Sequence, residues 1–142
     1  MKKHHTVSLT LLALVLAVGL FSLYQNIGGG KLAEDFQFIT EPSQTYTPQE
    51  ISDAADAVRS FKDFRGATMT TLRYVDGASS NERDNWAERY DKDQGLYFTC
   101  DFVTDDTAEQ SHLNANSSYQ DWIWRVARSN GEHWTIVSSG QG

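Results

Sequence analysis

The sequence predicts an α+β domain in which one amphipathic helix packs on a curved antiparallel sheet, preceded by a single N-terminal transmembrane helix. Three observations lead to this fold class. Residues 7–24 carry no charge, residues 48–64 repeat apolar side chains at helical spacing, and residues 95–104 and 119–138 alternate apolar and polar side chains as strands do. A helix with one apolar stripe and a sheet with one apolar face each need a covering partner, and packing them together satisfies both.

The N-terminal segment predicts a membrane tether. Residues 7–24 would span about 27 Å as a helix, close to the roughly 30 Å hydrocarbon core of a bilayer. We favour an uncleaved signal-anchor, because the apolar run continues past the small-x-small pattern Ala17–Gly19. The alternative is a signal peptide cleaved there. Lys2 and Lys3 predict a cytoplasmic tail at residues 1–6 and a body outside the cytoplasm, anchored in the cell membrane by a single pass, or secreted if cleaved.

Charge and cysteine content exclude several classes of function. The chain has 142 residues and a formal net charge of -7, and Lys2 and Lys3 are the only charged residues among the first thirty, which leaves -9 for the rest. Such an acidic body disfavours binding to nucleic acid or to anionic lipid. The single cysteine, Cys100, rules out an intrachain disulfide and a thiolate zinc cluster. Its place on the apolar face of its strand predicts a buried, inert thiol.

Residues 25–46 are predicted to form a spacer, flexible at Gly28–Gly30. Phe36, Phe38 and Ile39 could attach this spacer to the domain as a short strand or staple.

The amphipathic helix is predicted over about residues 48–64. Thr47 and Glu50 have the spacing of a capping box, and Pro48 suits the first helical position. Gly66 is expected to end the helix. The apolar stripe expected to face the core consists of Ile51, Ala54, Ala55, Val58 and Phe61.

A strand is predicted over residues 67–75, with a bulge near Thr70–Thr71 because the apolar positions before and after it are out of phase. A second capping-box pattern at Ser79–Glu82 begins a short helix, whose expected apolar edge is Trp86, Ala87 and Tyr90.

The last two strands are predicted to form a β-hairpin over residues 119–138, joined by a short turn containing Asn130–Gly131. Together with residues 95–104 they would make an antiparallel meander. The expected core-facing side chains of the hairpin are Trp122, Trp124 and Val126 on the first strand, and Trp134, Ile136 and Ser138 on the second.

These segments resemble a known group of small bacterial exported domains. The sequences FKDFRG, TMTTLRYVD, WAERY, NANSSYQDWIWRVAR and WTIVSSGQG are similar to those of the NTF2-like family of unknown function DUF4829. The resemblance covers about residues 45–142 and implies an NTF2-like or cystatin-like fold for an extracytoplasmic domain at 47–142. The family's lipid-attachment cysteine is missing, so the tether would be the helix itself. The resemblance implies no active residues and no cofactor.

Candidate site residues come from the aromatic face. NTF2-like folds often enclose a pocket between helix and sheet, which Tyr74, Phe98, Trp124 and Trp134 would line for a small apolar ligand. The competing interpretation is a packed core. No catalytic residue is assigned, because the alternation places the groups Asp101, Asp121, Arg125 and His133 on the opposite face. No metal site is assigned either, because His112 and His133 have no ligand-spaced partner.

Three hypotheses about function follow. The favoured one is a non-catalytic, membrane-tethered extracytoplasmic module that binds an unknown protein or a small apolar ligand. The first alternative is an NTF2-like enzyme acting on a small apolar substrate in the pocket. The second is a structural module that forms a homodimer through the open sheet face, which an exposed apolar patch at Tyr97, Ile123 and Val137 would favour.

Overall fold

The computed structural model describes residues 29–61, 63–77 and 86–141. The predicted tail and transmembrane helix, and the capping box at Ser79–Glu82, lie outside the described residues. Within the described ranges, no helix combines the length and the apolar character needed to cross a membrane.

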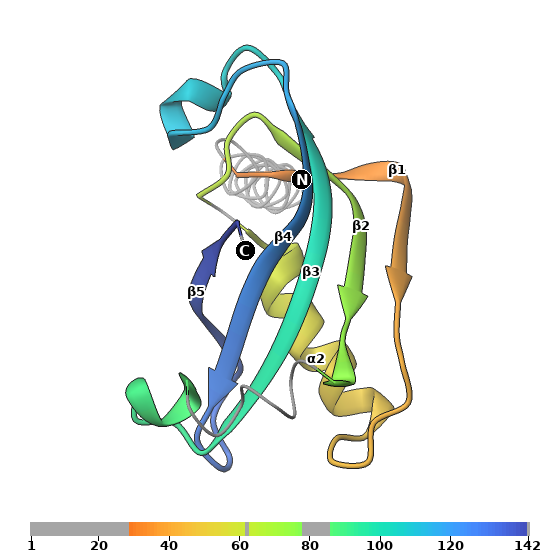
Figure 1. The fold of residues 1–142 in the computed structure, drawn as a ribbon, viewed down its shortest axis with the longest axis vertical. Helices are drawn as coiled ribbons and strands as arrows, with labels where there is room; N and C mark the ends of the chain where they lie inside the picture. Colours follow the sequence, from red (N-terminus) through yellow and green to blue (C-terminus); the bar gives the residue numbers. More distant parts are fainter. Residues whose placement is uncertain (1–28, 62, 78–85, 142) are drawn as a thin grey trace, which may run out of the picture.

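Among the described residues the fold is α+β, with one main helix and a five-stranded sheet in the order β1-β2-β3-β4-β5 (Figure 1). β3 to β5 form the predicted antiparallel meander, and β2 pairs antiparallel with β3, but β1 runs parallel to β2. The sheet is therefore mixed and not purely antiparallel. Parallel neighbours need a crossover connection, and α2 supplies it. The elements are β1 (Lys31–Ile39), α2 (Pro48–Arg59), β2 (Ala67–Tyr74), β3 (Gln94–Thr104), the 3-10 turn η1 (Ala108–Ser111), β4 (Ser118–Arg128) and β5 (Thr135–Gly140).

β1 lies inside the range 25–46 that was predicted as a spacer. Of the two forms predicted for Phe36, Phe38 and Ile39, a short strand or a staple, the structure has the strand. It pairs with β2 only near its two ends, with Leu32 opposite Met69 and Phe38 opposite Leu72. The register shifts between Leu32 and Gln37. Phe36 and Phe38 are partly buried against the core, so this strand extends the sheet and helps to cover it.

The start of α2 is confirmed, and its predicted end is wrong. Thr47 accepts a hydrogen bond from the Glu50 amide at 3.2 Å, and the Glu50 carboxylate accepts one from the Thr47 amide at 2.9 Å. The helix ends at Arg59, where the backbone hydrogen bonds change: the Phe61 amide donates to the Val58 carbonyl, only three residues back. Tight turns follow, and Gly66, with φ of 82°, lies in the last of them.

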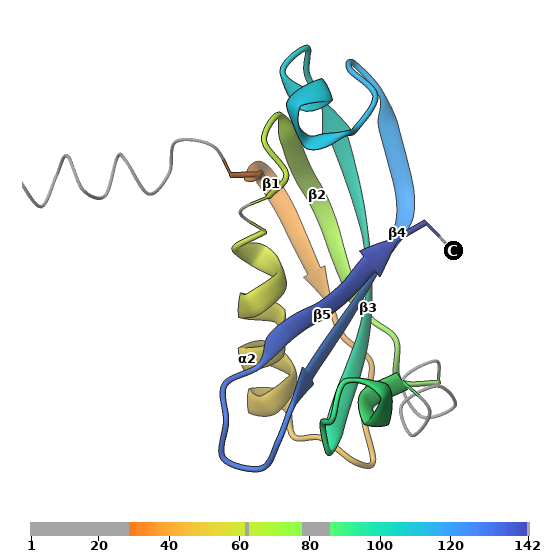
Figure 2. The same ribbon diagram turned by 90° about the vertical axis from the view of Figure 1, so that its left-hand side faces the viewer.

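One face of the sheet packs against α2 (Figure 2). An aromatic core fills the space between them. The predicted bulge in β2 is confirmed, since the register shifts between Met69 and Thr71. Ile136, expected in the core, is instead 37% exposed. β5 is the last strand of the sheet, so no further strand covers its outer side. The buried side chains of β3 and β4 that face this core are Leu96, Phe98, Cys100, Phe102, Trp124 and Val126.

The opposite face carries a smaller apolar cluster at one end. Trp86 and Ala87 pack there against Ala127, with Val137 partly buried beside them. Gly95 makes this contact possible, because a Cβ atom at that position would lie 2.5 Å from the Trp86 ring. Tyr90 was expected to share this edge, but it is 44% exposed.

Candidate functional site

The four residues predicted to line a pocket all lie in the core. Tyr74, Phe98, Trp124 and Trp134 are at most 8% exposed. The ring of Trp124 packs on Phe64 with centroids 5.0 Å apart, and Tyr74 packs on Phe98 at 5.7 Å. This burial supports the packed-core interpretation, while ligand binding by the four residues stays a prediction.

Cys100 is buried among these aromatic side chains. The Trp124 indole N–H donates to its sulfur at 3.0 Å, and burial raises the pKa of the thiol to about 12. A thiol that stays protonated at neutral pH is neither a nucleophile nor a metal ligand. Cys100 therefore contributes packing and no chemistry.

The other side of the sheet holds the polar side chains that sequence alternation placed there. We call this surface the open face and define it by the following residues of β2, β3 and β4 and of the chain end: Arg73, Tyr97, Thr99, Asp101, Val103, Gln120, Asp121, Ile123, Arg125 and Gln141. Asp101, Asp121 and Arg125 lie on it as expected, whereas His133 is exposed in the loop between β4 and β5.

Asp101 lies at the centre of the open face, between a bulge in β2 on one side and a bulge in β4 on the other. The β2–β3 register shifts at Thr70, and the β3–β4 register shifts at Gln120 and Asp121. The Thr70 hydroxyl donates to the Asp101 carbonyl at 3.2 Å, and the Asp121 amide donates to its carboxylate at 3.0 Å. Asp101 thus supplies acceptors where the regular ladder is interrupted.

The Asp101 carboxylate also forms an ion pair with Arg73. The Arg73 guanidinium donates to Asp101 at 2.5 Å and lies 3.9 Å from the Asp121 carboxylate. The hydrogen bond from Arg73, with that from the Asp121 amide, keeps the pKa of Asp101 below its usual range, although partial burial opposes this shift. Asp121 adopts a left-handed backbone with φ of 54°, and its side chain is 80% exposed.

This arrangement predicts an acid-sensitive contribution to stability. Because the folded pKa of Asp101 is lower than its unfolded value of about 3.9, its contribution is present above about pH 5 and is lost as the pH falls through the folded pKa. We expect Asp101→Asn to lower the free energy of unfolding by roughly 1 kcal/mol at pH 7. The loss is small because the Arg73–Asp101 pair is partly exposed to solvent. The substitution should also flatten the fall in stability below pH 5. Urea unfolding at several pH values tests this, and an unchanged acid slope would contradict it.

The sequence did not reveal the bulge in β4, although it contained a signal. Tyr119 and Trp122 are three residues apart, yet both pack towards the core, and Tyr119 stacks on Phe102 with ring centroids 4.7 Å apart. Strict alternation allows only even spacings on one face. The odd spacing, which contains Asp121, a residue type that tolerates left-handed backbone, indicates one inserted position.

Beside Asp101 the open face is hollowed. The hollow has a volume of about 420 Å³ and is lined by Tyr97, Thr99, Gln120, Asp121, Ile123 and Gln141. The Arg125 guanidinium lies 5.7 Å from the centre of the Tyr97 ring along one side. Amide, carboxylate, hydroxyl and aromatic groups therefore meet in one concave area.

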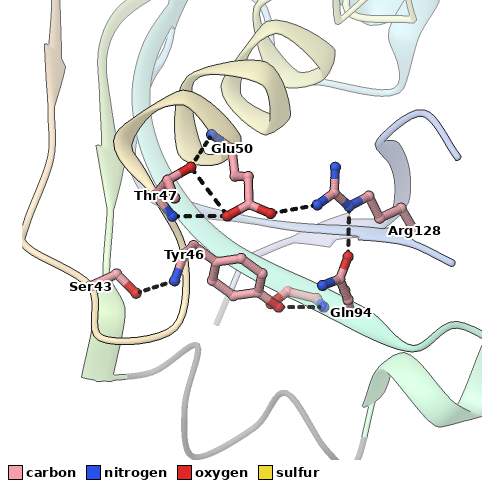
Figure 3. A network of polar contacts seen from close by, with 7 residues as sticks. Ser43, Tyr46, Thr47, Glu50, Gln94 and Arg128 are labelled. Carbon is pink, nitrogen blue, oxygen red and sulfur yellow. Dashed lines mark hydrogen bonds and ion pairs between the residues drawn. The ribbon is translucent and has the colours of Figure 1, made fainter. Parts of the chain in front are cut away.

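A second polar network lies on the helix side of the sheet (Figure 3). The Glu50 carboxylate accepts from Arg128 at 2.7 Å, and the Arg128 Nε donates to Gln94 at 2.7 Å. The Arg128 guanidinium also lies 4.3 Å from the centre of the Trp134 ring. The Tyr46 hydroxyl exchanges hydrogen bonds with the amide and carbonyl of Gly95. These contacts join the first turn of α2 to the ends of β3 and β4, which is a structural task.

Metal coordination finds no support in the part of the chain that the structure describes, where no three His, Cys, Asp or Glu side chains are grouped as a metal ion would need. The described chemistry of the open face is hydrogen bonding, ion pairing and aromatic contact.

Comparison of the chain with protein-family models, with curated proteins and with solved structures found no match.

Proposed function

We propose that this chain is a membrane-tethered extracytoplasmic domain of NTF2-like or cystatin-like type, which binds a partner protein through its open face and catalyses no reaction. The tether is residues 7–24, whose apolar, uncharged sequence follows Lys2 and Lys3. The helix-on-sheet architecture is compatible with these fold types.

One observation carries the proposal: the carboxylates of Asp101 and Asp121 lie on the opposite side of the sheet from the aromatic core. Phe98 and Trp124 are almost fully buried beneath α2, while Asp101 and Asp121 lie on the open face. A general acid or base must come within hydrogen-bonding distance of the substrate. A substrate held in the aromatic core would therefore be out of reach of these carboxylates.

The open face has the composition of a transient protein interface. Such interfaces are about as polar as ordinary surface, and Tyr and Arg are enriched among their strongest contacts. Tyr97 and Arg125 lie together beside a hollow, and the bulge at Asp121 directs an exposed carboxylate outwards. A partner with donor groups and one apolar side chain would fit this surface.

The two alternatives are less well supported. An enzyme with Tyr74, Phe98, Trp124 and Trp134 around its substrate would need space that the packed rings occupy. A homodimer through the open face was expected to use an apolar patch at Tyr97, Ile123 and Val137. These three side chains are each partly buried, and Val137 packs on the Trp86 cluster.

Benzene binding tests the proposal against the enzyme alternative. We expect benzene to leave the melting temperature of the full-length chain in a mild non-ionic detergent unchanged, because a filled core has no room for it. Phe98→Ala is the positive control, since engineered apolar cavities bind benzene. That variant should melt lower than the wild type and be restored in part by benzene. A saturable rise in the melting temperature of the wild type would contradict a filled core and favour the enzyme.

A further inference from the structure

The point at which the proposed tether joins the domain is fixed by backbone contacts. The Gly30 amide donates to the Phe61 carbonyl at 3.2 Å, and a Cβ atom at Gly30 would collide with the Phe61 ring. The next residue, Lys31, begins β1 and lies opposite Thr68 of β2. The chain therefore enters the fold at a defined position of the sheet.

This entry point lies near one end of the long axis of the domain. Thr68 is in turn opposite Val103, one residue before the end of β3, and the loop that contains η1 follows. The Asp105 amide in that loop donates to the Gly66 carbonyl at 2.8 Å. Figure 2 shows η1 at one extremity of the domain and the turn between β4 and β5 at the other. We call residues 105–117 the η1 end and residues 129–134 the hairpin end.

The chain between the predicted membrane span and the domain is too short to let the domain turn over. From Tyr24, the last residue of the predicted span, to Gly30 there are six residue steps, which reach at most about 22 Å. On β3, Gln94 is nine residues from Val103, which corresponds to about 30 Å. Turning the hairpin end towards the bilayer would require Gly30 to stand at least that far from it.

We propose that the domain, held by the tether proposed above, stands with its η1 end towards the bilayer and its hairpin end away from it. Charge favours this upright arrangement over one in which the domain lies on its side. The residues after the first thirty carry -9, so anionic lipid headgroups repel them. The least body surface approaches the headgroups when only one end faces the bilayer.

The short chain sets this orientation, and attraction to lipid does not. The η1 end carries the exposed acids Asp105, Asp106 and Glu109, which anionic headgroups repel. The end is therefore held near the bilayer without binding to it. A longer connection should release the domain from this orientation.

The orientation also determines how a partner reaches the open face. β3 and β4 run between the η1 end and the hairpin end, so the faces of the sheet point sideways when the domain is upright (Figure 2). The hollow lined by Tyr97, Asp121 and their neighbours then opens along the plane of the bilayer. A partner of the open face meets the domain from the side.

Energy transfer to lipid headgroups tests the orientation. The full-length chain is reconstituted in vesicles of phosphatidylcholine and phosphatidylglycerol, with an acceptor dye on a fraction of the headgroups. A donor dye is attached at Gln110→Cys on η1 or at Asn130→Cys in the hairpin end, because both positions are exposed and Cys100 is buried. We expect several-fold more efficient transfer from Gln110→Cys, because transfer falls steeply with distance.

A glycine–serine insertion of about 40 residues between Gly28 and Gly29 is the matched control. Its mean end-to-end distance of about 35 Å exceeds the distance needed to turn the domain over, so it should remove most of the difference between the two dyes. Equal transfer from both sites without the insertion, or stronger transfer from Asn130→Cys, would overturn the inference. A difference that survives the insertion would overturn it too, because contact with lipid would then set the orientation.

The inference rests on the tether of the proposed function, and extraction of the vesicles with alkaline carbonate tests that tether separately. Release of the chain by carbonate would overturn both the tether and the orientation. A chain that stays in the vesicles but transfers energy equally from both sites would overturn the orientation alone. Neither dye position lines the hollow, so binding through the open face is tested independently.

Discussion

Trp124→Ala is expected to lower the free energy of unfolding by about 3–5 kcal/mol, the usual cost of removing a large aromatic side chain from a packed core. Trp124 is 2% exposed, and its ring contacts Phe61 and Phe64, which follow the end of α2. Its indole N–H also donates to Cys100. The substitution therefore leaves a cavity in the core where the segment after α2 packs on the sheet.

Urea denaturation followed by circular dichroism measures this loss. Val103→Ala is the matched control, because Val103 is 45% exposed on the adjacent strand and its truncation should change stability by about 0.5 kcal/mol or less. A loss below about 1 kcal/mol for Trp124→Ala would mean that the core is loosely packed at this position.

Arg128→Ala is expected to cost about 2–3 kcal/mol, because hydrogen bonds to charged groups contribute more than neutral ones. The Arg128 side chain is only 18% exposed, and it donates to Glu50 and Gln94. Its loss would leave Glu50 with its capping contacts but without a counter-charge, and would uncover one face of the Trp134 ring. Arg128→Lys keeps the charge but loses the forked geometry, so it should recover only part of the loss.

Chemical denaturation measures this effect too, with Lys92→Ala as the control. Lys92 pairs with Glu132 at 2.9 Å on the surface, where solvent screening leaves such a bridge little effect on stability. A double-mutant cycle with Glu50→Gln isolates the pair. If the two substitutions are additive, the link between the first turn of α2 and the end of β4 contributes nothing measurable.

Local signals in the sequence predicted the elements that depend on local chemistry. The capping box at Thr47 and Glu50 positioned the start of α2 correctly, since two side-chain contacts determine it. The broken phase around Thr70 predicted the first bulge. Alternation assigned the buried and exposed sides of β3, including Cys100 and Asp101.

The features that were missed depend on distant contacts. The parallel pairing of β1 with β2 requires a crossover that no pattern within residues 31–39 encodes. The helix end at Arg59 is set by the turns that follow, and Gly66 was the more conspicuous signal. The exposure of Ile136 follows from the position of β5 at the sheet edge.

The candidate site was only half predictable. Alternation correctly moved Asp101 and Asp121 away from the aromatic core, which argued against catalysis. It could not show that the bulges on both sides of Asp101 bring Arg73 and the Asp121 amide to one carboxylate. That convergence comes from the registers of two separate strand pairs, and only the assembled sheet brings them together.

The central claim is that a partner binds the open face, and site-specific photo-cross-linking in host cells tests it most directly. A benzophenone side chain at Gln120, exposed at the rim of the hollow, should form one defined adduct. The same side chain at Gln37, exposed on β1, is the matched control and should not form that adduct. The Gln120 adduct should be lost when Asp121→Arg is introduced. The same adduct from both positions, or none from Gln120, would contradict binding through the open face.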